Sequence, residues 1–317
     1  RTGREASEYA AEIRRIMRYL QVSDGNMQEG SLRCDVNISV RQGSDSPFGT
    51  KVEIKNMNSF SAIQKACDYE IQRQINAYES GEKISQETRL WDESKQLTKS
   101  MRSKEGSSDY RYFPDPDLGP IEVTQRMREQ WRSQLPELPA AKRQRFSQKL
   151  GLSAYDSRVL TDEQPMALYF EEVVSAGAEP KAASNWITGD IAGYVNSNKQ
   201  DFEKLPFRPQ QLAEMLAMID NGQISGKIAK DILPELLKEG GSAKNIVSER
   251  GLGMISDPDL ISQMVEELLN SYPKEVDAYR AGKKKLQGFF VGQLMKKTGG
   301  KADPKLVNQI LIKKLQS

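Results

Sequence analysis

The chain has 317 residues with 46 Lys and Arg against 44 Asp and Glu, and a prior of roughly 150 residues per domain predicts two or three domains. It has no histidine, which excludes Ser-His-Asp and Cys-His catalysis, HExxH zinc sites and any imidazole base within the chain. No run approaches the roughly 20 apolar residues of a membrane helix. The two cysteines, Cys34 and Cys67, are too few for a disulfide scaffold, so we expect both to be reduced thiols in a cytosol-like compartment.

The first region, residues 1–123, mixes helical and strand patterns. Apolar residues recur every three to four positions in two segments, and apolar and polar residues alternate in three others. The predicted order is helix 4–20, strand 31–41, strand 50–56, helix 60–78 and strand 84–91. The first two strands are expected to form an antiparallel hairpin, and residues 98–123, which are rich in Arg, Asp and Pro, contain a loop-like stretch over 110–120. This region is therefore predicted to be α+β with an antiparallel sheet.

Strand patterns end at about residue 124, and the rest of the chain is predicted to be helical. Residues 124–253 contain amphipathic helices with short turns. Residues 254–317 form a further helical unit, because Asp257 before Pro258 and Asp303 before Pro304 are typical helix starts. The apolar residues expected to form its core are Ile261, Val265, Leu268, Phe289, Phe290, Leu294, Leu306, Val307 and Ile310.

Charge is distributed unevenly along the chain. The segment from Arg280 to the end carries ten basic residues and one acid, Asp303, so its charge is +9 on a body of −7. Such a tail favours a polyanion such as nucleic acid, although a Lys-rich helix can also be a solvated surface. The candidate nucleic-acid contacts are Lys283, Lys284, Lys285, Lys296, Lys297 and Lys301.

The polar face of the predicted hairpin is the strongest local signal for chemistry. It carries Arg33, Asp35, Asn37, Glu53 and Lys55, and Glu29 precedes it. If the hairpin closes symmetrically, Asp35 lies opposite Lys55 and Asn37 lies opposite Glu53. Carboxylates and amides are suitable ligands for Mg²⁺, and Lys and Arg bind phosphate. The alternative is a set of cross-strand salt bridges on an ordinary surface.

A second constellation lies in the loop-like segment that follows. Arg102, Lys104 and Arg111 can clamp phosphates, and Asp115 and Asp117 can hold a metal or cap a turn, although Pro-Asp turns are common in any protein. Standard nucleotide motifs are incomplete, because residues 222–228 are one residue short of a P-loop and residues 251–253 lack the third glycine of a Rossmann turn. Any ATP site is therefore expected to be based on the sheet.

Seven segments resemble the B subunits of the aspartyl/glutamyl-tRNA(Asn/Gln) amidotransferases, the GatB family. They are residues 27–40, 51–60, 86–93, 101–105, 109–118, 288–297 and 301–308. The resemblance covers nearly the whole chain and keeps the family's order. It implies a partial cradle domain over residues 1–123, a helical domain over 124–253 and a YqeY-like tRNA-binding tail over 254–317.

The resemblance also implies a reaction and its partners. In this family, the GatB chain binds a mischarged Glu-tRNA(Gln) or Asp-tRNA(Asn) and uses ATP and Mg²⁺ to phosphorylate the side-chain carboxylate. Ammonia, released from glutamine by the amidase (A) subunit, then displaces phosphate, and the small (C) subunit is a tether in the heterotrimer. The protein is then an ATP-dependent carbon–nitrogen ligase of the cytoplasm, or of an organellar matrix or stroma in a eukaryote, with no membrane partner.

By motif position, the residues that the resemblance proposes for catalysis are Glu29, Asp35, Asn37, Glu53, Lys55, Arg102 and Arg111, with Asp35 and Glu53 also proposed as metal ligands. The chain departs from the family in two places. A Gly-Leu-Glu-Val-His-type segment that carries metal-binding Glu and His is missing, and Ser108 stands where many relatives have His. We therefore expect a fragment lacking the N-terminal part of the cradle and inactive in isolation. The alternative hypothesis is a non-catalytic tRNA-binding module.

Overall fold

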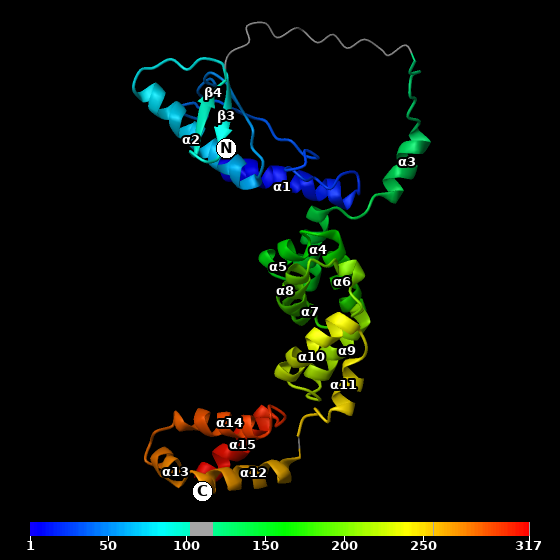
Figure 1. Ribbon diagram of the computed structural model, residues 1–317, viewed down its shortest axis with the longest axis vertical. Helices are drawn as coiled ribbons and strands as arrows, with labels where there is room; N and C mark the ends of the chain where they lie inside the picture. Colours follow the sequence, from blue (N-terminus) through cyan, green and yellow to red (C-terminus); the bar gives the residue numbers. More distant parts are fainter. Residues whose placement is uncertain (102–116, 256, 317) are drawn as a thin grey trace. The chain divides into compact units, whose positions relative to one another are not determined.

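The computed structural model describes residues 1–101, 117–255 and 257–316. The chain divides into two compact units, Arg1–Lys142 and Arg143–Ser317, each with its own secondary structure (Figure 1). The first unit contains helices and a small sheet, and the second is helical, so the predicted α+β class is confirmed. Among the described residues, none of the helices is long and apolar enough to cross a membrane.

The first unit begins with a helix, a strand pair and a second helix. Its elements are α1 (Gly3–Tyr19), β1 (Val36–Ile38), β2 (Val52–Lys55), α2 (Phe60–Glu79), β3 (Thr88–Asp92), β4 (Leu97–Ser100) and α3 (Gln125–Gln134). Side-chain caps start both long helices, because the Thr2 hydroxyl accepts from the amide of Glu5 and the Ser59 hydroxyl accepts from the amide of Ala62. Strand β4 was not predicted from the sequence.

The four strands form one sheet in the order β1-β2-β3-β4. The outer pairs are antiparallel but β2 and β3 are parallel, so the predicted antiparallel sheet is wrong for its central pair. The reason is that α2 connects β2 to β3 as a crossover helix, which returns the chain to run in the same direction. The predicted register of the hairpin is confirmed, since Asn37 lies opposite Glu53.

Strand β1 is much shorter than the predicted strand over residues 31–41. The residues before it belong to a turn, in which the amides of Ser31 and Leu32 donate to the carbonyl of Asn26 at 2.9 and 3.4 Å. The alternating pattern therefore begins inside a turn, where these two amides bond the chain locally and form no strand ladder.

Helix α2 covers one face of the sheet and packs against α1, as Figure 1 shows in blue and cyan. Its Ile63 and Cys67 join Ile54 and Trp91 of the sheet in one buried cluster. Both cysteines are free, as predicted, and burial raises the pKa of the Cys67 thiol to about 11. The opposite face of the sheet carries the polar residues of β1 and β2.

A buried polar network joins α2 to the two outer strands. The carboxylate of Glu70, which is fully buried, accepts hydrogen bonds from Arg73 at 2.6 and 2.9 Å, from Gln74 at 3.0 Å and from the Thr98 hydroxyl of β4 at 3.0 Å. The Gln74 amide also bonds the backbone beside β1, where it accepts from the Val40 amide and donates to the Ile38 carbonyl. The helix therefore fixes both edges of the sheet through polar contacts.

The second unit contains two separate hydrophobic clusters. The first is formed by ten consecutive helical elements, of which α4 begins at the end of the first unit. They are α4 (Pro139–Leu150), α5 (Ala154–Leu160), α6 (Gln164–Ser175), α7 (Pro180–Trp186), the π-helix η1 (Ile187–Ile191), α8 (Ala192–Asn198), the 3₁₀ turn η2 (Phe202–Lys204), α9 (Pro209–Asp220), α10 (Gly226–Glu239) and α11 (Ala243–Glu249). The described residues from 117 onward contain no strand beyond one isolated bridge between Ile255 and Ala302, which agrees with the helical prediction.

The second cluster, here called the tail, is formed by α12 (Pro258–Ser271), α13 (Pro273–Arg280), α14 (Leu286–Lys297) and α15 (Pro304–Gln316). Both predicted helix starts are confirmed, because the Asp257 and Asp303 carboxylates accept from the first backbone amides of α12 and α15. All nine residues predicted to form the core lie in this cluster. Six of them are buried, and Phe289, Leu306 and Ile310 are partly buried against it.

Candidate active site

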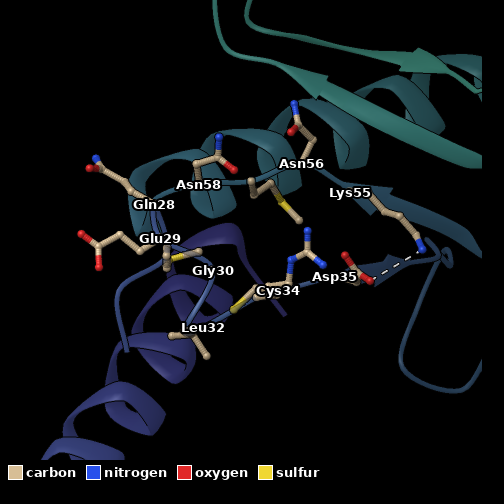
Figure 2. A pocket seen from close by; sticks show the side chains of 12 residues that line it. Gln28, Glu29, Gly30, Leu32, Cys34, Asp35, Lys55, Asn56 and Asn58 are labelled. Atoms are coloured by element: carbon tan, nitrogen blue, oxygen red, sulfur yellow. Dashed lines mark ion pairs between the residues drawn. The ribbon is translucent and has the colours of Figure 1, made fainter. Parts of the chain in front are cut away.

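The polar face of the hairpin borders a cavity of about 510 Å³ in the first unit. Two segments line it, the turn between α1 and β1 and the connection between β2 and α2 (Figure 2). The lining residues are Met27, Gln28, Glu29, Gly30, Leu32, Arg33, Cys34, Asp35, Lys55, Asn56, Met57 and Asn58. The volume is within the range of small-molecule sites, and most of the side chains are polar or charged.

Local backbone geometry places these two segments. In the first segment, Gly30 has a φ of +84°, a value that favours glycine, and it closes the turn that carries Glu29. In the second, Lys55 is the last residue of β2 and Ser59 is the N-cap of α2, so the strand becomes a helix within four residues. The end of a strand and the start of a helix therefore meet at the cavity.

Lys55 lies between two carboxylates. Its Nζ is 3.7 Å from Oδ2 of Asp35 and 3.6 Å from Oε1 of Glu53, and Figure 2 shows the Asp35 pair as a dashed line. The Thr88 hydroxyl donates to the other oxygen of Glu53 at 2.8 Å. The three charged side chains are 31–51% exposed, so each pair contributes at most about 1 kcal/mol and a bound anion can compete for the ammonium.

The structure brings some of the predicted site residues together and separates others. Glu29, Asp35 and Lys55 line the cavity, and Glu53 lies beside Lys55 on the same face of the sheet. Asn37 instead lines a different cavity of about 920 Å³ between α1, β1 and α2. Arg102 and Arg111, like Lys104 and Asp115, lie outside the described residues.

Four further polar residues, Gln28, Arg33, Asn56 and Asn58, line the cavity without having been assigned to the site from the sequence. Arg33 was recognised only as part of the polar face, and within the described residues no ion pair or hydrogen bond involves its guanidinium. Gln28 and Asn58 are single amides in irregular segments, where periodicity carries no signal. The only signal in the sequence for Gln28 and Asn58 was their position inside segments 27–40 and 51–60, which resemble the GatB family.

The fit of the site to Mg²⁺ depends on its carboxylates. Within the described residues no group of three or more Asp, Glu or Cys side chains is arranged to hold a metal ion. Asp35 and Glu53 together supply two hard oxygen donors beside the cavity. Protein sites for Mg²⁺ usually use one or two carboxylates, with water and phosphate oxygens as the other ligands, so the chemistry of this donor pair fits the ion. Their assignment as metal ligands stays a prediction.

Five of the six predicted nucleic-acid contacts in the tail fall into two groups, and the sixth, Lys296, is exposed in the last turn of α14. Lys283, Lys284 and Lys285 are exposed in the turn before α14, where Lys284 also lies over the Tyr279 ring with its Nζ 4.2 Å from the centroid. Lys297 is paired with Glu267 of α12 at 2.7 Å, and Lys301 donates to the Gly251 carbonyl at 2.8 Å.

The acidic residues of α12 reduce the positive charge of the folded tail. Residues 254–317 contain eleven basic and seven acidic residues, although the segment from Arg280 alone has a charge of +9. Lys314 is also paired with Glu266, a residue of α12. The turn formed by Lys283, Lys284 and Lys285 is therefore the part of the basic segment best placed to meet phosphates.

Comparison with known families finds two matches along the chain. Residues 1–129 match a family model described as the GatB/GatE catalytic domain, and residues 168–315 match one described as the GatB domain. The chain belongs to the GatB family. All residues that line the cavity lie in the part that matches the GatB/GatE catalytic domain, and the tail lysines lie in the part that matches the GatB domain.

Individual GatB relatives are similar over the full length of the chain. It is 77% identical over 316 residues to the B subunit of the aspartyl/glutamyl-tRNA(Asn/Gln) amidotransferase of Synechococcus sp. (strain WH7803). The proteins of the same name from Synechococcus sp. (strain CC9605) and Prochlorococcus marinus (strain NATL1A) are 76% and 73% identical. All of this chain is covered in each comparison, and it spans 64% of the length of each relative.

Proposed function

We propose that the protein acts as the B subunit of a tRNA-dependent amidotransferase. It binds Glu-tRNA(Gln) or Asp-tRNA(Asn), transfers the γ-phosphoryl group of ATP to the side-chain carboxylate, and lets ammonia displace the phosphate to give Gln-tRNA(Gln) or Asn-tRNA(Asn). The observation that carries this proposal is the 77% identity, over the whole chain, to a protein named for that activity. The polar cavity inside the part that matches the catalytic domain supports it.

The chemistry of amide formation explains why such a site contains charged residues and needs no histidine. A carboxylate is a poor acyl donor, because hydroxide would have to leave, and phosphorylation converts that oxygen into a good leaving group. Phosphoryl transfer depends mainly on positioning and on stabilising the charge of the phosphate oxygens. The proposal therefore requires cations at the cavity.

Lys55 and Arg33 are the cations that line the cavity. In the proposal, the Lys55 ammonium binds phosphate oxygens, and Asp35 and Glu53 hold it in place until an anion arrives. Arg33, whose guanidinium makes no ion pair within the described residues, binds a second oxyanion with its planar fork of donors. Mg²⁺, when held by Asp35 and Glu53, would neutralise additional phosphate charge.

The proposal includes partners that supply the other substrates. Ammonia comes from glutamine through the amidase (A) subunit, the small (C) subunit completes a cytoplasmic heterotrimer, and the mischarged tRNA contacts the tail. The exposed lysine turn before α14 supports the tRNA contact, because phosphates are bound mainly by Lys and Arg.

Replacing Glu53 by Gln in the complete heterotrimer tests the catalytic part. We expect ATP cleavage that depends on mischarged tRNA to fall on the order of 10²-fold, because Glu53 holds the Lys55 ammonium and a misplacement of about 1 Å at a reacting centre costs that much, while glutaminase activity stays mostly intact. Glu79→Gln, at the exposed end of α2, is the matched control and should change neither activity. Normal ATP cleavage in the Glu53 variant would refute the assignment of the site.

A second candidate function is tRNA binding without chemistry, and the exposed lysine turn favours it. Measuring ATP cleavage and tRNA binding in the same set of variants distinguishes the two functions. If Glu53→Gln and Lys55→Ala leave ATP cleavage unchanged while changes in the lysine turn weaken tRNA binding, the non-catalytic function is supported. If the changes at Glu53 and Lys55 abolish ATP cleavage, the protein is catalytic.

A further inference from the structure

The connection between β2 and α2 contains a left-handed residue, a backbone conformation that is uncommon outside glycine and that Asn adopts more readily than most other residues. Asn56 has a φ of +68°, in the left-handed region that residues other than glycine adopt in only a few per cent of cases. Four residues other than glycine have positive φ within the described part of the chain, and Asn56 is the one among them that lines the candidate active site. Backbone outliers that persist at such sites are held by their surroundings.

The surroundings of Asn56 show what holds it. In the parallel pair of strands, Lys55 lies opposite Leu90, so Asn56 would pair next with Trp91. Its left-handed backbone ends the strand instead, and its side-chain Nδ2 donates to the Trp91 carbonyl at 3.2 Å. The amide side chain therefore takes the place of the next backbone hydrogen bond of the sheet.

The acceptor of this hydrogen bond is itself firmly held. Trp91 is 2% exposed, and its indole Nε1 donates to Glu93 at 2.6 Å. Figure 2 shows the Asn56 side chain turned toward the neighbouring strands, whereas Lys55 and Asp35 face each other beside the cavity. The hydrogen bond thus links the cavity wall to the buried part of β3.

The geometry of the connection determines where Lys55 lies. On one side of Asn56, Lys55 ends β2; on the other side, Met57 is buried at 4% exposure and Ser59 caps α2. The left-handed conformation of Asn56 turns the chain out of its extended path, so the strand can stop at Lys55 and the helix can begin five residues later, at Phe60. An extended residue at this position would carry the strand past the cavity.

We infer that Asn56 is a positioning residue for the reaction, which holds Lys55 at the cavity by combining a left-handed backbone with the hydrogen bond to Trp91. The inference rests on the proposed function of Lys55 as a phosphate-binding group. Asn56 contributes no charge and acts through Lys55. A positioning error of about 1 Å at a reacting centre costs on the order of 10²-fold in rate, so the effect is measurable.

The test is a double-mutant cycle between Asn56→Ala and Lys55→Ala in the full heterotrimer, with ATP cleavage measured in single turnovers at saturating mischarged tRNA. Asn56→Ala should lower the rate about 10–100-fold when Lys55 is present, and should lower it little further in the Lys55→Ala background. Asn56→Gly, which adopts the left-handed conformation freely but lacks the amide, should recover part of the rate. Thermal unfolding of each variant shows whether stability changes.

Gln74→Ala provides the matched control, because Gln74 is also a buried amide that bonds the backbone of the sheet, but on the side away from the cavity. It should lower the unfolding temperature and leave the rate of the folded enzyme unchanged. Equal losses from Asn56→Ala with and without Lys55, or no loss in either background, would overturn the inference. If Lys55→Ala alone leaves ATP cleavage unchanged, the proposed function of the site fails, which is a separate result.

Discussion

Replacing Lys283, Lys284 and Lys285 by alanine changes an exposed basic turn of the tail. The structure limits how much of the positive charge is available there, because Lys297 is paired with Glu267 and Lys314 with Glu266. If each lysine of the turn contacts one phosphate, the three together contribute about 2–3 to the slope of log affinity against log salt, at 0.7–0.9 per contact. The variant should lose that part of the slope.

The same arithmetic gives the change in affinity. Three contacts make binding about 20–40-fold weaker when salt rises from about 50 to 200 mM, and the triple variant should not show this part of the decrease. Tail stability should fall by about 0.5–1 kcal/mol, because Lys284 also lies over the Tyr279 ring. The loss of tRNA affinity should be similar for tRNAs of different sequence, because phosphate contacts carry no sequence information.

The assay is tRNA binding by the complete protein across a salt series, with circular dichroism as the test of folding. Lys297→Ala is the control, because this side chain is already paired within the tail and should change the slope less than any one lysine of the turn. An unchanged slope in the triple variant, or an equal effect of Lys297→Ala, would contradict the reasoning and leave the turn as a solvated surface.

Two more predictions concern the first unit. Burial raises the pKa of Cys67 to about 11, so the folded state favours the neutral thiol and the unfolded state loses its proton first. The contribution of Cys67 to the free energy of unfolding should therefore fall as pH rises from about 9 to 11, and urea titrations at several pH values should show a steeper fall in the native sequence than in Cys67→Ala. Glu70→Ala removes a fully buried carboxylate from Arg73, Gln74 and Thr98, and it should lower the free energy of unfolding by about 3 kcal/mol. Glu79→Ala, at the exposed end of the same helix, should change the free energy of unfolding by less than about 0.5 kcal/mol. Equal effects of the two changes in urea unfolding would refute the buried network.

Local patterns in the sequence were sufficient for most of the helices and for the register of the hairpin. The caps at Asp257 and Asp303 act on backbone amides two residues away, so their effect can be predicted from neighbouring positions alone. The pairing of Asn37 with Glu53 followed from the alternation of side chains, which fixes the faces of two adjacent strands once the hairpin closes. The core of the tail was predicted in the same way from helical spacing.

Only the tertiary structure decided which distant groups meet. The parallel direction of β2 and β3 depends on how α2 packs on the sheet, and no local pattern encodes that choice. Asn56 lies 35 positions from Trp91, and Lys314 lies 48 positions from Glu266, so neither the positioning hydrogen bond nor the reduced charge of the tail could be predicted from sequence spacing. Periodicity reports which face of an element is buried, whereas the partner on the other side is determined by the packing of the whole unit.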